Sequence, residues 1–193
     1  DLELAVALEP NHLSLYGLTV EAKTPLARWV ERGASVPAPD GRAEAEYLAA
    51  NERLVRAGYR HYEVSNAARP GFESRHNRAY WRRAPYLGLG PSAHSAVGAH
   101  RWWNIRDWEA YRQAAAAGSL VAGNEHLTPE QVGLEDLYLG LRTDGGIPAS
   151  SLPLGELEAW ETAGWASRVG SSLVLTPLGW LRLDALVSRV ARS

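Results

Sequence analysis

The first 65 residues alternate between segments typical of strands and segments typical of helices. Apolar residues recur through 12–20 and 59–65, which predicts two strands; helices are predicted over 24–33 and over 40–58, the second capped by its first Asp. Strand, helix and strand at this spacing are typical of a parallel βαβ unit, whose ligands bind beyond the carboxyl ends of its strands. We therefore expect any site to lie near the loops after the two strands. The positions expected to be buried are Leu13, Leu15, Leu18 and Val20 in the first strand, and Tyr47, Leu48, Leu54 and Val55 in the long helix.

The middle of the chain begins with a long segment, 66–85, that has no sustained hydrophobic period. It is longer than ordinary connections, so it is either disordered or functional, and its aromatic residues favour order. After it the sequence predicts a short strand over 86–90, a turn of small residues over 91–98 and an edge strand over 100–103. A helix over 107–118, with an aspartate at its start and a glycine at its end, follows.

From residue 124 onward the pattern changes to helices around one hairpin. The expected elements are a helix over 128–143, a helix over 154–163, a hairpin over 166–175 and a last helix that begins at Thr176. Two helices, a hairpin and a closing helix form the outline of a winged helix. We therefore expect two domains, residues 1–123 and 124–193, with a boundary near 122–124.

The chain has 193 residues, 46% of them hydrophobic, and contains neither Cys nor Met. This is enough apolar material for a packed core, and without cysteine the chain has no disulfide, zinc-thiolate or iron-sulfur ligand of its own. No run of eighteen apolar residues and no signal-peptide pattern occurs, so we expect a soluble protein. Because it lacks an initiator Met, we expect it to be a piece of a longer protein.

Charge divides the chain in the same place as the hydrophobic pattern. From residue 124 nine acidic residues stand against five arginines, a balance of −4, whereas the first 123 residues carry +2. Within the first part five arginines crowd into fifteen residues beside a single acidic residue, Glu73, with aromatic residues in or next to the same stretch. The arginines are Arg69, Arg75, Arg78, Arg82 and Arg83, and the aromatic residues are Phe72, Tyr80, Trp81 and Tyr86.

Five stretches resemble a known family in order and spacing. They are HLSLYGLTVE (12–21), YEVSN (62–66), SRHNRAYW (74–81), YLGLGPSAHS (86–95) and RWWN (101–104). On these residues the chain resembles the HemW heme chaperones, relatives of the oxygen-independent coproporphyrinogen III oxidases. The pattern His76-Asn77-x-x-Tyr80-Trp81 is typical of HemW and absent from the true oxidases.

The resemblance implies a fold of the α/β class. The family is similar to radical S-adenosylmethionine enzymes, whose partial (β/α) barrel carries a [4Fe-4S] cluster on a CxxxCxxC loop. Residues 12–103 would then be the carboxy-terminal part of such a barrel, followed by a small winged-helix-like α+β domain. Because this chain has no cysteine, we expect the cluster and most of the S-adenosylmethionine pocket to lie outside it, and we expect the chain alone not to cleave S-adenosylmethionine reductively.

A heme site needs an axial donor for the iron, apolar surfaces for the porphyrin and cations for the propionates. Without Cys or Met, the axial donor here must be His or Tyr. Together with the resemblance, this favours His76 as the iron ligand, with further heme contacts from Asn77, Tyr80 and Trp81 and propionate contacts from Arg75, Arg78, Arg82 and Arg83. The alternative is that His76 and Asn77 are hydrogen-bonding residues that hold a long connection, with solvated arginines around them.

Other chemistry follows less directly. The resemblance places Thr19 and His94 beside S-adenosylmethionine; alternatively, the glycines around His94 serve only a tight turn. Glu21 and Glu63 are interpreted as hydrogen-bonding residues near the barrel mouth, and we assign no catalytic residue. The tryptophans Trp160, Trp165 and Trp180 are expected in the core.

Three functions follow from these features. The first, implied by the resemblance, is a protein that holds heme and passes it to respiratory heme proteins, in the cytoplasm or at the inner face of the membrane with which it associates peripherally. The second is a coproporphyrinogen III oxidase-like radical enzyme of porphyrin biosynthesis, against which the segment 76–81 argues. The third is an interaction module built on the winged helix. Nucleic acid is not an expected partner, because the second helix of that module carries Glu156, Glu158 and Glu161 and no cation.

Overall fold

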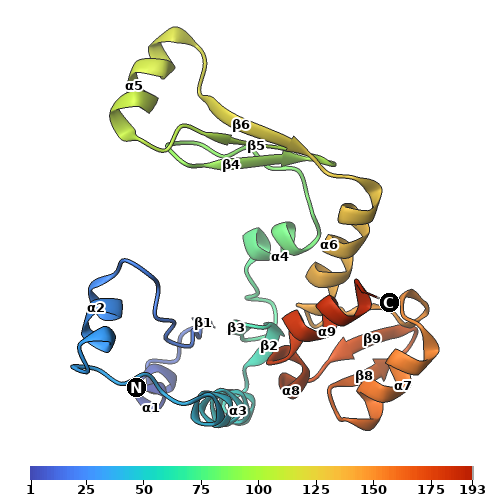
Figure 1. Ribbon diagram of the computed structural model, residues 1–193. Coiled ribbons are helices and arrows are strands. Elements are labelled where there is room, and N and C mark those ends of the chain that lie inside the picture. Colours follow the sequence, from blue (N-terminus) through green and yellow to red (C-terminus); the bar gives the residue numbers. More distant parts are fainter. Residues whose placement is uncertain (193) are drawn as a thin grey trace. The chain divides into compact units, whose positions relative to one another are not determined.

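The computed structural model describes residues 1–192, apart from the side chain of Asp40, and divides into two compact units. Unit 1 comprises residues 1–74 and 141–183, and unit 2 comprises residues 75–140 and those from 184 onward. Both mix helices with small sheets (Figure 1), which confirms the predicted α/β class. Among the described residues, no helix is long and apolar enough to cross a membrane. The division into folding domains at residues 123 and 124 stays a prediction.

Unit 1 begins with three helices and three short strands. They are α1 (Leu2–Ala7), β1 (His12–Ser14), α2 (Pro25–Glu31), α3 (Asp40–Arg56), β2 (Arg60–Glu63) and β3 (Asn66–Ala68). The hydroxyl of Thr24 caps α2 as expected, since it accepts a hydrogen bond from the backbone N–H of Ala27 at 3.1 Å. Helix α3 begins at Asp40 itself, with Pro39 in the cap position, and the predicted capping by the Asp40 side chain lies outside the described part of the chain.

The sheet of unit 1 differs from the predicted parallel βαβ unit. Its strand order is β1-β3-β2, and both pairings with the central β3 are antiparallel. Strand β3, which the sequence pattern did not predict, follows β2 after a tight turn and places Ala67 opposite both Leu13 and His61. Strands β1 and β2 therefore run in the same direction without being neighbours. Hydrophobic periodicity locates strands, but it does not tell which strands pair.

The predicted first strand is much shorter than 12–20. Strand β1 ends at Ser14, one further bond joins Leu15 N–H to the carbonyl of Ser65 at 2.7 Å, and Leu18 is 84% exposed. Strand β1 stops there because the neighbouring segment, which ends in β3, turns back into β2 just beyond that carbonyl. In α3, Leu54 is fully buried as predicted, whereas Val55 is 57% exposed and lies on the outer face. The buried centre consists of Leu54, Tyr59 and Ala67.

Unit 1 continues with residues 141–183, which follow the predicted order of helix and hairpin. The elements are β7 (Ile147–Pro148), a 3₁₀ turn (Ala149–Ser151), α7 (Leu154–Thr162), β8 (Ala166–Val169), β9 (Ser172–Leu175), α8 (Pro177–Trp180) and the start of α9 (Leu183–Val190). Strand β9 pairs antiparallel with both β7 and β8. Trp160 is fully buried and Trp180 is 8% exposed, which confirms their predicted place in the core, while Trp165 is half-buried.

Unit 2 is a three-stranded sheet with helices before, within and after it (Figure 1). Its elements are α4 (Arg75–Trp81), β4 (His94–Val97), β5 (His100–Asn104), α5 (Trp108–Ala117), β6 (Val121–His126) and α6 (Pro129–Leu141). All pairings are antiparallel in the order β4-β5-β6, so the predicted edge strand β5 is in fact the central strand. The predicted strand over 86–90 is a single bridge between Tyr86 and Ala96, and the predicted turn over 91–98 contains β4.

The helix ends of unit 2 agree with their sequence signals. The carboxylate of Asp107 accepts a hydrogen bond from Ala110 N–H at 2.9 Å, and Gly118 ends α5 in the left-handed conformation. At the start of α6 the hydroxyl of Thr128 accepts from Gln131 N–H, and the side chain of Gln131 accepts from Thr128 N–H, which forms a capping box. These interactions are local, so the sequence alone predicts them.

A buried imidazole in unit 1 predicts a pH-dependent stability. His61 on β2 is 8% exposed, neither ring nitrogen has a hydrogen-bond partner among the described residues, and burial lowers its pKa to about 4. In the unfolded chain, His61 therefore binds a proton near pH 6.5, whereas in the folded chain it binds one only near pH 4. We expect the free energy of unfolding to fall by roughly 1 to 3 kcal/mol as the pH drops through this window.

Denaturant unfolding at several pH values measures this effect. His61→Leu should abolish this part of the pH dependence, because leucine fills the site without a titrating group. His126→Leu, which changes an exposed imidazole, serves as the matched control and should keep the wild-type profile. Superimposable profiles for His61→Leu and the wild type would contradict the assignment.

Candidate functional site

Helix α4 carries the residues expected to contact heme. His76 and Tyr80 are four positions apart and therefore lie on one face of the helix, with their rings edge to face and centroids 4.7 Å apart. The imidazole of His76 is exposed, so a ligand can reach it from solvent. Asn77 and Arg78 are half-buried, and Arg75 is exposed at the start of the helix. The segment 66–85, expected to be a long connection, thus contains strand β3 and the ordered helix α4, which presents an accessible histidine.

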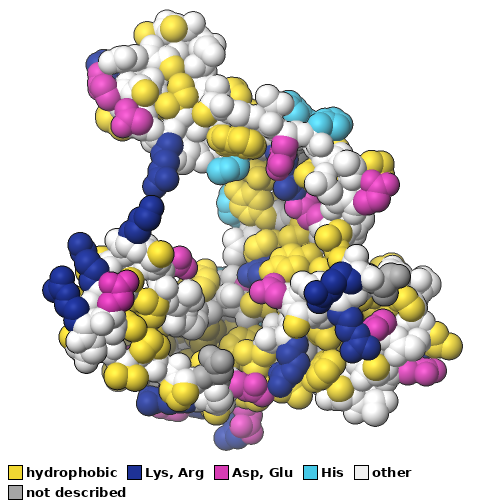
Figure 2. All heavy atoms as spheres, in the orientation of Figure 1, with side chains coloured by type: hydrophobic (Ala, Val, Ile, Leu, Met, Phe, Trp, Pro, Cys, Tyr) yellow, Lys and Arg dark blue, Asp and Glu magenta, His cyan; other side chains and the backbone are white. Residues whose placement is uncertain are grey.

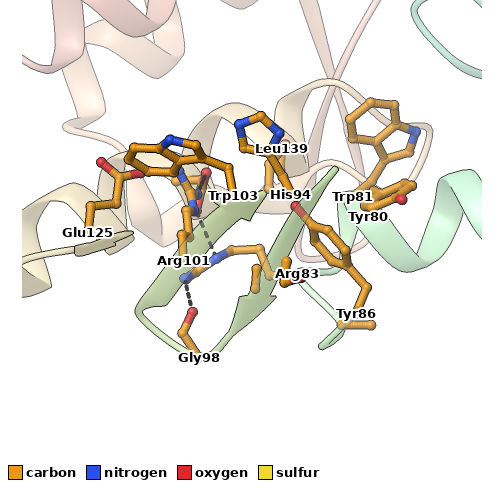
Figure 3. A pocket seen from close by; sticks show the side chains of 14 residues that line it. Tyr80, Trp81, Arg83, Tyr86, His94, Gly98, Arg101, Trp103, Glu125 and Leu139 are labelled. Atoms are coloured by element: carbon orange, nitrogen blue, oxygen red, sulfur yellow. Dashed lines mark hydrogen bonds and ion pairs between the residues drawn. The ribbon is translucent and has the colours of Figure 1, made fainter. Parts of the chain in front are cut away.

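A pocket of about 470 Å³ lies beside this helix within unit 2 (Figure 3). Tyr80 and Trp81 reach it from α4, Tyr86 from the following segment, and His94 and Trp103 from the sheet. Tyr80 packs edge to face against Tyr86 with ring centroids 4.7 Å apart, and His94 lies 5.9 Å from Trp103. The structure therefore brings together two residues expected to contact heme and one expected to contact S-adenosylmethionine. His76 does not line the pocket but contacts Tyr80, which does.

The charged residues of the pocket are paired with one another. The Nε of Arg83 lies 2.9 Å from the carboxylate of Glu135, and Arg101 forms a second ion pair with the same carboxylate. Arg83 also donates to the carbonyl of Gly98 at 3.0 Å (Figure 3). These two guanidinium groups hold the sheet and α6 together, so they are not open for a ligand carboxylate. Arg82, by contrast, is exposed, like Arg75.

Tyr86 is a polar group within the aromatic wall of the pocket. Burial, together with the neighbouring Tyr80, raises the pKa of Tyr86 above its usual value. Its phenol is therefore neutral at physiological pH and can donate a hydrogen bond to a bound ligand.

Close packing and hydrogen bonds in the segment 88–95 fix the position of His94. A Cβ atom on Gly88 would lie 2.1 Å from the backbone oxygen of His94, so only glycine fits there. Ser95 Oγ accepts a hydrogen bond from Gly88 N–H, and the amide of Asn104 donates to the carbonyls of Gly88 and Gly90 at 3.4 and 3.0 Å. Gly88 thus serves the packing of the turn, as the alternative interpretation expected. The sequence pattern did not predict the role of Asn104, although this residue lies in the RWWN stretch.

A second glycine shapes the wall opposite α4. A Cβ atom on Gly123 of β6 would lie 2.5 Å from the indole of Trp103, which pairs with Gly123 across the strands. The flat strand surface at Gly123 therefore lets Trp103 lie over β6 and line the pocket. No periodicity in the sequence signals this contact.

The two residues expected to contact S-adenosylmethionine fall in different compact units. His94 lines the pocket of unit 2, whereas Thr19 is an exposed residue of unit 1. Its neighbours Leu18 and Val20 line a separate, largely apolar cavity of about 610 Å³ beside α3. Within the described units, His94 thus lies in one pocket and Thr19 beside another.

Glu63 is a fully buried carboxylate, and its predicted hydrogen-bonding role is confirmed. It accepts hydrogen bonds from Ser65 N–H at 2.9 Å and from the side chain of Asn66. Arg142 Nε lies 3.0 Å from the other carboxylate oxygen, at an angle outside hydrogen-bond geometry, so this contact is an ion pair. Burial and the charge of Glu63 also raise the pKa of Tyr47, whose hydroxyl donates to the carbonyl of Val64. Glu21 is exposed and takes no part in this network.

Comparison with curated proteins identifies relatives along almost the whole chain. The heme chaperone HemW of Mycobacterium tuberculosis H37Rv is 40% identical over 191 residues, which cover 96% of this chain and 49% of that protein. HemW of Synechocystis is 38% identical over 79% of this chain, and a bovine mitochondrial protein named for a radical S-adenosyl methionine domain is 39% identical over 71%. The chain spans about half the length of its Mycobacterium relatives and a smaller share of the others. No family model matches.

The fold resembles one half of a solved radical S-adenosylmethionine enzyme. Coproporphyrinogen III oxidase (HemN) of Escherichia coli superposes with a TM-score of 0.67 over 97% of this chain and 49% of the enzyme, at 20% identity. The resemblance implies a [4Fe-4S] cluster, but such clusters are held by cysteine thiolates, and this chain has no cysteine with which to hold one. Sequence identity and fold together show that the chain belongs to the HemW family, and it spans about half the length of the Mycobacterium member.

Proposed function

We propose that this chain carries the heme-binding site of a HemW-type heme chaperone, with His76 as the axial ligand of the iron. The observation that carries the proposal is the exposed imidazole of His76 on α4, next to an aromatic pocket that begins at Tyr80. Imidazole is a usual axial donor for heme iron, and bound heme would supply the iron that the imidazole of His76 ligates. The residues of this chain would hold and orient that group.

The surroundings of His76 suit the rest of a heme molecule. Tyr80 and Trp81 offer flat apolar surfaces for the porphyrin, and Trp103 extends such a surface across the pocket. Arg75 and Arg82 are exposed on and just after α4, where guanidinium groups can bind propionate carboxylates through two hydrogen bonds each. Arg78 and Asn77, half-buried on the same helix, complete the proposed contacts. Arg83 is excluded from this role because Glu135 and Asp136 already pair with it.

The exposed position of His76 also suits transfer of heme to another protein. A heme held at an exposed histidine, outside a closed cavity, is accessible to an acceptor protein without unfolding of the carrier. The proposed acceptors are respiratory heme proteins, reached in the cytoplasm or at the inner face of the membrane. The names of the HemW relatives support heme binding, and the acceptors belong to this proposal alone.

In the longer proteins of the family, Thr19 and His94 are proposed to contact S-adenosylmethionine beside a cluster bound by the remainder of the chain. Residues 124–193 are proposed to form a winged-helix-like domain that does not bind duplex DNA. Helix α7 carries Glu156, Glu158 and Glu161, and Arg168 near its end is paired with Glu161 at 3.0 Å. Such a surface repels a phosphate backbone.

Titration with hemin, followed in the Soret region, tests the proposed function. We expect one hemin per chain and a spectrum typical of histidine ligation. Arg75→Ala or Arg82→Ala should weaken binding by about 1 to 3 kcal/mol, the scale of a charged hydrogen bond, and should leave the ligation spectrum unchanged.

Arg112→Ala provides the control for these variants. Arg112 is an exposed arginine of α5, paired with Glu109, and it lies outside the proposed site. Its replacement should leave hemin affinity unchanged. Equal losses in all three variants would show that the arginines act only through overall charge.

A further inference from the structure

Two histidines outside the proposed heme site lie opposite each other on the sheet of unit 2. His100 of β5 pairs in register with His126 of β6, both are exposed, and their ring centroids are 6.1 Å apart. The ring of Trp102 stacks on His100 at 5.1 Å with an interplanar angle of 29°. Figure 2 shows histidine side chains gathered on the surface of this part of the molecule.

The strand geometry brings these two side chains close together. Leu127 N–H donates to the carbonyl of Ala99 at 2.9 Å, so residues 99 and 127 form a hydrogen-bonded pair. Because such pairs alternate along an antiparallel ladder, His100 and His126 form a non-hydrogen-bonded pair, whose Cα atoms are only about 4.5 Å apart. Side chains of this kind of pair are the closest across a sheet.

The pair also lies apart from the pocket. Side chains alternate between the two faces of a strand, and the neighbours Arg101, Trp103 and Glu125 line the pocket. His100 and His126 therefore belong to the opposite face, where no residue of the proposed heme site lies. Their function is not explained by heme binding at α4.

The chemistry of two adjacent imidazoles is that of a metal chelate. Neutral imidazole binds Cu²⁺, Ni²⁺ and Zn²⁺, and two imidazoles whose nitrogens lie about 2.0 Å from one ion place their ring centroids roughly 4.5 to 6 Å apart. The observed separation of 6.1 Å needs only a small side-chain rotation to reach this range. Heme does not fit between them, because the histidines project from neighbouring strands about 4.8 Å apart and one ring is covered by Trp102.

We propose that His100 and His126 form a surface site for a late first-row divalent metal ion, with Cu²⁺ as the ion that binds most tightly. Among the described residues no group of three or more His, Asp or Glu side chains is placed to hold an ion, so the two imidazoles are the protein ligands and water completes the coordination. An open site with nitrogen and oxygen donors suits the tetragonal geometry of Cu²⁺, and the general order of stability places Ni²⁺ and Zn²⁺ below it.

Titration of the 193-residue chain with CuCl₂, followed by tryptophan fluorescence, tests the site. The first equivalent should quench fluorescence, because Trp102 stacks directly on one ligand. His100→Asn and His126→Asn should each weaken binding about tenfold or more, since the second imidazole acts as an intramolecular ligand at high effective concentration. The double variant, which lacks the remaining imidazole as well, should bind no more tightly than either single variant, and electron paramagnetic resonance of the wild-type complex should show coupling to two imidazole nitrogens.

Two controls separate this site from incidental binding. Trp102→Phe should reduce the quenching and keep the affinity, and His94→Asn, a change on the other face, should keep both. Wild-type affinity in both His100→Asn and His126→Asn would overturn the proposal. An equal loss in His94→Asn would do so as well, because it would show binding spread over unrelated histidines.

Discussion

Replacing His76 by alanine should remove the histidine-ligated Soret band of the hemin complex and lower hemin affinity roughly 10- to 100-fold. This is the usual loss of affinity when a residue next to a bound metal is replaced. The reason is that His76 is the accessible imidazole of α4, one helical turn from the aromatic residues of the pocket. Its side chain is exposed, so its loss removes a ligand without opening a cavity in the core. Absorption spectroscopy during a hemin titration measures the effect.

A rescue experiment distinguishes ligation from a structural role. Free imidazole added to the His76→Ala complex should restore the histidine-type spectrum, because the ligand position stays open beside Tyr80. Tyr80→Phe keeps the aromatic face and should retain the wild-type band. Failure of imidazole to restore the band, with an unchanged circular dichroism spectrum, would mean that His76 does not ligate the iron.

Replacing Glu63 by alanine should destabilise unit 1 by about 3 to 5 kcal/mol, the usual consequence of removing one partner of a buried ion pair. The carboxylate is fully buried and accepts hydrogen bonds from Ser65 and Asn66, while the guanidinium of Arg142 lies 3.0 Å away. The variant leaves the donors of Ser65 and Asn66 without this acceptor and removes the carboxylate that pairs with Arg142. Urea unfolding, followed by far-ultraviolet circular dichroism, measures the change.

A matched pair of variants shows whether breaking the ion pair causes the loss. Glu63→Met combined with Arg142→Met removes both charges and should be considerably more stable than either single variant. Arg60→Met is a control, because Arg60 forms an ion pair with Asp144 at 2.5 Å while 62% of its side chain is exposed, and such pairs contribute little. If Glu63→Ala costs no more than Arg60→Met, the network does not hold unit 1 together.

Local features of the fold were predictable from the sequence, and pairing between strands was not. Thr24, Asp107 and Thr128 cap their helices as expected, because a cap needs only residues within one turn. Strand β3 and the central place of β5 escaped prediction, since each depends on a partner distant in the chain. The resulting antiparallel sheet replaced the parallel unit that periodicity suggested.

In the candidate site, too, contacts between distant residues were not predictable from the sequence. His76, Tyr80 and Trp81 were identified through the resemblance, but the sequence pattern did not predict the helix α4 that carries them. The ion pairs of Glu135 were not predicted, because Arg101 and Glu135 are 34 residues apart and no local pattern links them. Arg83 was grouped with the other arginines by sequence, yet its contacts with Glu135 and Gly98 give it a structural role.

One comparison tests heme binding at His76 most directly. Each of the six histidines is replaced singly by alanine, and the hemin complex of each variant is examined for its Soret band and affinity. The chain offers His12, His61, His94, His100 and His126 as alternative ligands, so adventitious binding is measured in the same series. Loss of the histidine-ligated band in His76→Ala alone is the predicted result. An unchanged band and affinity in His76→Ala, with loss in another variant, would contradict the proposal and assign the site to that other histidine.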